Sequence, residues 1–169
     1  MRIAGIKKND CINGEGIIVS LWFQGCPHRC PGCHNPETWD FEGGEEIDYN
    51  AIEQIIFDAI PKNGIQRNFA VLGGEPLCPE NCVDAMHIIK KVKEQFPQCK
   101  IFLWTGYTIE EIKETSDILY DLIKSNVDVL IDGRFDKNQK DLTLPLCGSR
   151  NQRIWTNHLT KCKKFDIIY

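Results

Sequence analysis

Short apolar runs alternate with segments of helical period along this 169-residue chain, which is the pattern expected of consecutive βα units. The apolar runs are rich in β-branched and aromatic residues and are bounded by glycine or polar residues, as strands buried on both faces are. They predict strands at residues 17–24, 69–72, 100–104 and 127–131. We therefore expect a mostly parallel sheet.

Segments of helical period follow the first three of these strands. Apolar residues spaced three or four apart mark one amphipathic helix, which Pro61 ends: Ile52, Ile55, Ile56, Ala59 and Ile60. A second helix is marked by Val83, Met86, Ile89 and Val92. Thr108 and Glu111 have the spacing of a capping box, which predicts the start of a third helix that runs through Ile112.

Every predicted strand ends in small or polar residues, from Gly25 after the first strand to Asp132 and Gly133 after the fourth. The carboxyl ends of parallel strands lie on one rim of a sheet, so these residues should surround one ligand site. Four or five strands are too few for a closed eight-stranded barrel, which predicts an α/β fold with a partial, open βα barrel. The length fits a single domain over residues 1–169.

Composition and charge argue against nucleic-acid and membrane partners. The hydrophobic share of 42% and the charged share of 26% are ordinary for a globular protein. A net charge of -4 and a pI near 5.6 give no basic surface for nucleic acid or an anionic membrane. Residues 1–14 lack the apolar core of a signal peptide, and the longest apolar stretch, residues 17–23, is too short to span a membrane. We expect a cytoplasmic protein.

Three cysteines, Cys26, Cys30 and Cys33, lie in one short loop directly after the first strand with the spacing C-x3-C-x2-C. A structural zinc ion usually takes two pairs of ligands, and an electron-transfer iron-sulfur cluster takes one thiolate per iron. Three thiolates on a four-iron cluster would leave one iron open for a substrate. The alternative is a zinc ion with a fourth ligand from this set: His28, His34 or Cys78.

The chain has nine cysteines. An odd count without a secretion signal indicates reduced thiols and metal ligation rather than a disulfide framework. We interpret Cys78 and Cys82 as part of the first turn of a helix, because two cysteines cannot hold a cluster alone. The sequence assigns no role to the other four: Cys11, Cys99, Cys147 and Cys162. Residues 161–169 fit either a final strand or a docking segment.

The C-x3-C-x2-C motif defines the radical S-adenosylmethionine (SAM) enzymes, and the chain resembles them beyond this motif. CHNPETW at residues 33–39 and GGEP at residues 73–76 resemble the activating enzymes of glycyl-radical enzymes. Three further segments resemble the branch of that family that activates anaerobic ribonucleoside-triphosphate reductases: NGEG at 13–16, VDVLIDGRF at 127–135 and GSRNQR at 148–153. The resemblance covers roughly residues 10–155.

This resemblance implies a 4Fe-4S cluster on Cys26, Cys30 and Cys33, with SAM on the fourth iron. In such enzymes the reduced cluster cleaves SAM to methionine and a 5'-deoxyadenosyl radical, which takes a hydrogen atom from a glycine of the partner. The partner implied is the glycyl-radical subunit of an anaerobic ribonucleoside-triphosphate reductase, with flavodoxin or ferredoxin as electron donor. Because the cofactors carry the chemistry, no catalytic acid, base or nucleophile is implied.

The resemblance also implies which residues contact SAM. Beside the cluster these are Gly32, Cys33 and His34, and at the end of the second strand it is Gly74. We add Gly73, whose backbone can approach the ligand in the same way, and Glu75, which lies at the same rim. Glycines lack a Cβ, so their backbone can come close to a ligand. Asp132 is added because it lies at the end of the fourth strand.

Three functions are in competition at this point. The favoured hypothesis is an activase that installs a glycyl radical in anaerobic ribonucleotide reductase. The second keeps the radical chemistry but has another glycyl-radical enzyme or a small molecule as its target, as in the deazaguanine-synthase relatives. The third is a noncatalytic metal-binding or electron-transfer module, which would not respond to SAM. The sequence does not identify the docking surface or the oligomeric state.

Overall fold

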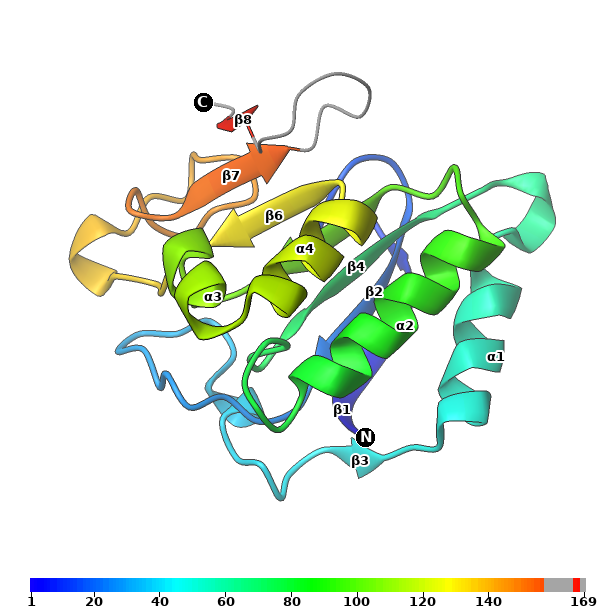
Figure 1. The fold of residues 1–169 in the computed structure, drawn as a ribbon, viewed down its shortest axis with the longest axis horizontal. Coiled ribbons are helices and arrows are strands. Elements are labelled where there is room, and N and C mark those ends of the chain that lie inside the picture. Colours follow the sequence, from blue (N-terminus) through cyan, green and yellow to red (C-terminus); the bar gives the residue numbers. More distant parts are fainter. Residues whose placement is uncertain (157–165, 168–169) are drawn as a thin grey trace.

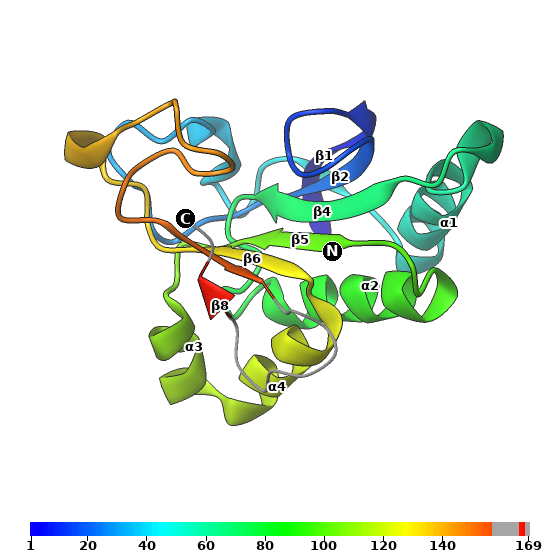
Figure 2. The ribbon, with the colours of Figure 1, turned by 90° about the horizontal axis from the view of Figure 1, so that it is seen from above.

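The computed structural model describes residues 1–156 and 166–167. Within this part of the chain, one sheet contains the strands β1 (Arg2–Asp10), β2 (Ile18–Phe23), β3 (Glu45–Glu46), β4 (Asn68–Gly73), β5 (Ile101–Trp104), β6 (Val129–Asp132), β7 (Arg153–Thr156) and β8 (Asp166–Ile167). The α-helices are α1 (Tyr49–Ala59), α2 (Cys82–Gln95), α3 (Ile109–Thr115) and α4 (Asp117–Asn126). Short 3-10 helices are η1 (Pro36–Thr38), η2 (Lys62–Gly64) and η3 (Lys137–Gln139). Figures 1 and 2 show α2, α3 and α4 against one face of the sheet.

The predicted strands form the centre of the sheet. β2, β4, β5 and β6 are parallel neighbours, with Leu21 opposite Val71 and Val71 opposite Leu103. Antiparallel strands extend the sheet on both sides, β1 and β3 beyond β2, and β7 and β8 beyond β6. The strand order of the described sheet is β3-β1-β2-β4-β5-β6-β7-β8. The two edge strands, β3 and β8, do not pair with each other, so the sheet is not closed into a barrel. The prediction of an open α/β fold is therefore confirmed.

Apolar side chains cover both faces of the central strands. On the helix side, Val19, Leu21 and Phe69 belong to the main core together with residues of the helices. On the opposite face, a smaller cluster consists of Ile18, Ala70, Leu72 and Phe102, with Trp22 and Trp104 packed against it. Because both faces are apolar, these strands read as continuous hydrophobic runs in the sequence.

The helices form where their caps and apolar positions predict. In α1, Ile52, Ile56 and Ala59 are buried, and the Asp48 side chain accepts hydrogen bonds from backbone amides of the first turn. The capping box of α3 is confirmed: the Glu111 amide donates to the Thr108 hydroxyl, and the Thr108 amide donates to the Glu111 carboxylate. α3 continues three residues beyond the predicted Ile112, to Thr115.

Several features differ from the sequence prediction. Val83, assigned to the apolar stripe of α2, is 72% exposed, because it lies in the first turn of the helix, where the helix extends beyond the core. The strands β1 and β7 and the helix α4 have no counterpart in the prediction. Of the residues 161–169, Asp166–Ile167 pairs with β7 as a final strand, whereas Cys162 lies outside the described residues. Within the described chain, no helix combines the length and the apolarity needed to cross a membrane.

Candidate functional site

The carboxyl ends of the central strands surround a cavity of about 160 Å³. Its lining includes Cys26, Cys30 and Cys33 after β2, Gly73, Gly74 and Glu75 at the end of β4, Thr105 and Gly106 after β5, and Gly133, Arg134 and Phe135 after β6. Figure 2 shows the cysteine loop and the segment after β6 at this end of the sheet, on the side opposite α2, α3 and α4. The predicted meeting of the strand ends around one site is confirmed.

The three thiols are partly buried in this cavity. Burial raises the pKa of Cys26 and of Cys30, and nearby backbone amides act in the opposite direction on both. The Asn35 amide donates to the Cys33 sulfur at 3.4 Å. Amides directed at sulfur favour the thiolate form, which is the form that binds iron. The loop is therefore built to hold charged sulfur once a metal compensates for burial.

The side chains considered as zinc ligands do not gather at one point in this structure. In the part of the chain that the structure describes, no three side chains of histidine, cysteine, aspartate or glutamate converge closely enough to hold one ion. Both ring nitrogens of His28 already have hydrogen-bond partners, and Cys78 is fully buried in the core. His34 is exposed on the loop. Cys26, Cys30 and Cys33 all line one cavity, and in a four-iron cluster each thiolate binds a different iron.

Gly73 and Gly74 bring the end of β4 into close contact with the backbone of β2. A Cβ on Gly73 would lie 2.6 Å from the Phe23 nitrogen, and the φ of Gly73 is +109°. A Cβ on Gly74 would lie 2.3 Å from the Gly25 carbonyl oxygen. Neither neighbour is a flexible side chain. Glycine is thus required here by the approach of protein backbone, in addition to any approach of a ligand.

The carboxylate of Glu75 is buried, with 1% of the residue exposed. Its oxygens accept hydrogen bonds from the Thr105 hydroxyl at 2.7 Å and from the Gly106 amide at 2.6 Å. They also accept from the Leu77 amide at 2.9 Å and face Nε2 of His28 at 3.0 Å. Glu75 therefore lies at the cavity, as predicted, but its carboxylate joins protein segments to one another.

Three other predicted SAM contacts, Gly32, His34 and Asp132, do not line the cavity. Gly32 and His34 are exposed beside Cys33 and do not belong to its lining. Asp132 is fully buried and faces away from the cavity: its carboxylate accepts from the Ile109 amide at 2.8 Å and from Nε of Arg153 at 2.9 Å. Contact between Asp132 and SAM stays a prediction that this orientation disfavours.

Further residues of the site were not predicted from the sequence. Arg134 donates from Nε to Nδ1 of His28 at 3.2 Å and pairs with Glu111 at 3.0 Å. Trp39 lines the cavity, and its buried indole nitrogen has no hydrogen-bond partner within the described chain. A buried donor without a partner is costly, so a bound acceptor would satisfy it. The place of Trp39 in the CHNPETW segment is the sequence signal for it.

The GSRNQR segment holds the chain that follows β6. Gln152 donates to the Gly133 carbonyl at 3.0 Å, and Asn151 donates to the Arg134 carbonyl at 2.7 Å. Gln152 also lines the cavity, whereas Arg153 begins β7 and pairs with Asp132. The segment thus contributes both to the mouth of the cavity and to a sheet edge.

Cys78 and Cys82 lie next to the site but outside the cavity. The Cys82 amide donates to the Cys78 carbonyl at 2.8 Å. The interpretation as a first helical turn holds for Cys82, the first residue of α2, whereas Cys78 lies in the turn before the helix. Burial raises the pKa of Cys78 to about 12, with a further contribution from Glu80. A thiol with such a pKa is protonated and inert at neutral pH.

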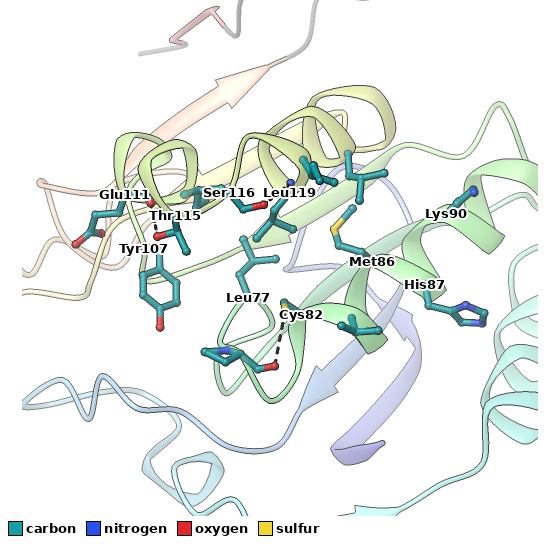
Figure 3. A pocket seen from close by; sticks show the side chains of 15 residues that line it. Leu77, Cys82, Met86, His87, Lys90, Tyr107, Glu111, Thr115, Ser116 and Leu119 are labelled. Atoms are coloured by element: carbon teal, nitrogen blue, oxygen red, sulfur yellow. Dashed lines mark hydrogen bonds between the residues drawn. The ribbon is translucent and has the colours of Figure 1, made fainter.

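A larger groove, of about 660 Å³, lies on the helix side of the sheet. Figure 3 shows Met86 and Cys82 of α2 on one side and Thr115, Ser116 and Leu119 on the other, with Leu77 between them. Its lining is mostly apolar, and none of the three loop cysteines belongs to it. Because chemistry needs reactive groups as well as volume, the smaller cavity is the candidate functional site.

Comparisons with known proteins identify the family of the chain. A family model described as a 4Fe-4S single cluster domain matches residues 12–155. The chain is 38% identical over 148 residues to the anaerobic ribonucleoside-triphosphate reductase-activating protein of Enterobacteria phage T4. The aligned region covers 88% of this chain and 89% of the relative. The proteins of the same name from Pasteurella multocida and Escherichia coli K12 are 37% and 34% identical, over 86% of this chain and 91% and 92% of theirs.

Proposed function

The chain belongs to the family of anaerobic ribonucleoside-triphosphate reductase-activating proteins, which carries a 4Fe-4S domain, and from this premise we propose how it acts. It is a radical SAM activase whose target is an anaerobic ribonucleoside-triphosphate reductase. The observation that supports this most directly is the cavity at the strand ends, where three thiols and the Gly73-Gly74-Glu75 turn face one another.

Cys26, Cys30 and Cys33 would hold the 4Fe-4S cluster. The three residues line one cavity, as the ligands of a single cluster must. A cluster held by three protein ligands would leave one iron available to bind SAM.

When bound, the cluster supplies one electron that cleaves SAM, and the resulting 5'-deoxyadenosyl radical removes a hydrogen atom from a glycine of the reductase. The protein's contribution is to orient and enclose SAM. Backbone groups of Gly32, Cys33, His34, Gly73 and Gly74 would bind its polar end. The cavity is smaller than the roughly 300 to 1,000 Å³ of pockets that enclose a small ligand, so SAM would extend over the apolar face of the sheet beside it.

Two partners follow from this function. The glycyl-radical subunit of the reductase would approach at the open side of the sheet, and a flavodoxin or ferredoxin would supply the electron. The net charge of -4 supports a protein partner rather than a nucleic acid. We keep the cytoplasmic location as a prediction.

The test is anaerobic reconstitution with iron and sulfide, followed by reduction and addition of SAM and an anaerobic ribonucleotide reductase. We expect 5'-deoxyadenosine by chromatography and a glycyl-radical doublet by electron paramagnetic resonance. Deoxyadenosine without the doublet would refute the target and keep the radical chemistry. A four-iron protein that yields neither signal would refute the activase.

A further inference from the structure

The Glu75 carboxylate joins three segments that meet at the cavity. Its four hydrogen bonds come from Leu77 in its own turn, from Thr105 and Gly106 after β5, and from His28 in the cysteine loop. A buried carboxylate with this many donors is fixed in position, because any rotation would leave buried polar groups unsatisfied. Of these contacts, only the one to His28 reaches the cysteine loop.

The His28 ring is held on several sides. Arg134 has no acceptor, so the Nδ1 atom of His28 that it contacts must accept, and Nε2 then donates to Glu75. The ring also packs edge-on against Tyr107 at 4.5 Å between centroids. Gly106 makes room for it, since a Cβ there would lie 2.4 Å from Cδ2 of His28.

Fixing His28 fixes the backbone between two of the cysteines. His28 lies midway between Cys26 and Cys30, and Arg29 has a φ of +46°, a conformation that non-glycine residues rarely adopt. Such a conformation persists only where the surroundings impose it. The backbone amides of His28 and Arg29 are directed at the Cys26 sulfur. The side chain of His28 thus determines where these two amides point.

We propose that Glu75 and His28 form a brace that positions the loop between Cys26 and Cys30 and thereby sets the reduction potential of the cluster. The inference rests on the proposed function for its cluster. Hydrogen bonds to cluster sulfurs stabilise the reduced, more negative state and raise the potential. His28 is a positioning residue, which acts through the loop backbone and not as an iron ligand.

Two variants disturb the brace in different ways. His28→Phe keeps a ring but removes both nitrogens, and Gly106→Ala leaves both side chains intact while displacing the ring. The matched control is His87→Phe, which removes a second histidine-glutamate pair, at 2.7 Å from Glu53, away from the cavity. His28→Gln retains an amide N–H for Glu75 and should recover part of the effect.

The first measurement uses the metal-free protein and limited trypsin digestion. Cleavage after Arg29 should be about tenfold faster in His28→Phe and Gly106→Ala, the change expected when a hydrogen bond to a charged group no longer opposes local opening. His87→Phe should be cleaved like the wild type. Because neither iron nor SAM is present, this readout does not depend on activity.

The second measurement is the midpoint potential of the reconstituted cluster, from a redox titration followed by electron paramagnetic resonance without SAM. Both brace variants should shift to more negative potential than His87→Phe, and His28→Gln should lie between. Wild-type potential and wild-type cleavage in both brace variants would overturn the brace and leave the proposed function intact. Faster cleavage in a protein whose wild type forms no four-iron cluster would support the brace and refute the proposed function.

Discussion

Gly74→Ala tests whether the end of β4 touches the loop after β2 as closely as the structure indicates. The added Cβ would lie 2.3 Å from the Gly25 carbonyl oxygen and 2.8 Å from its carbon. The backbone there is held by the hydrogen bonds from the Glu75 amide to the Gly25 carbonyl and from the Gly74 amide to the Phe23 carbonyl, both 2.8 Å long. No side-chain rotation can relieve the clash, so the two segments must separate.

The expected loss follows from that separation. Breaking the bond between the Glu75 amide and the Gly25 carbonyl costs about 1 to 3 kcal/mol when a buried group is left unsatisfied, and overpacking costs about 1 to 3 kcal/mol. Allowing for partial relaxation, we expect a decrease of about 2 to 4 kcal/mol in the free energy of unfolding. With a urea m-value of about 2 kcal/mol/M, the midpoint would fall by about 1 to 2 M.

The assay is equilibrium urea unfolding of the metal-free protein, followed by circular dichroism. Gly5→Ala in β1 is the matched control, because nothing lies within 4 Å of a Cβ placed there. It should be at least as stable as the wild type, since alanine restricts the unfolded chain. Equal stability of Gly74→Ala and Gly5→Ala would refute the close approach of the two segments.

Three further predictions concern single side chains. Cys30→Ala should abolish four-iron loading and SAM cleavage at unchanged secondary structure, while Cys11→Ala retains both; iron analysis and deoxyadenosine release measure this. Arg153→Met should lower the free energy of unfolding, measured in urea, by about 2 to 3 kcal/mol, because Asp132 stays buried without its guanidinium partner; the loss is below the about 3 to 5 kcal/mol of a fully buried pair because Arg153 is partly exposed. With its pKa raised to about 12, Cys78 should stay protonated at pH 8 and resist iodoacetamide while exposed Cys11 reacts, as peptide mass spectrometry would show; equal rates would contradict the burial argument.

The centre of the fold could be predicted from the sequence, and the edges could not. β2, β4, β5 and β6 are apolar on both faces and therefore stand out as hydrophobic runs. β1 carries several exposed polar residues, and β7 has only four residues, all partly exposed. Their pairing depends on partners far along the chain, and such pairing leaves little trace in local periodicity.

The site shows the same division between local and distant information. The cysteine triplet and the GGEP turn are contiguous motifs, so their residues could be named in advance. The partners of His28 are 47 and 106 positions away, and no spacing rule connects Glu75 and Arg134 to it. The sequence correctly predicts that Asp132 lies at the end of a strand. The direction of its side chain depends on Arg153, which belongs to β7, a strand that local sequence patterns do not predict.

The open sheet leaves the site without a complete wall. In the described chain, the edge strands β3 and β8 lie at opposite ends of the strand order, so the protein encloses its cavity on some sides only. A carbon radical in contact with bulk water and buffer is quenched by any available hydrogen donor. The reductase would therefore have to form the missing wall as it presents its glycine, and the substrate protein would itself shield the radical that modifies it.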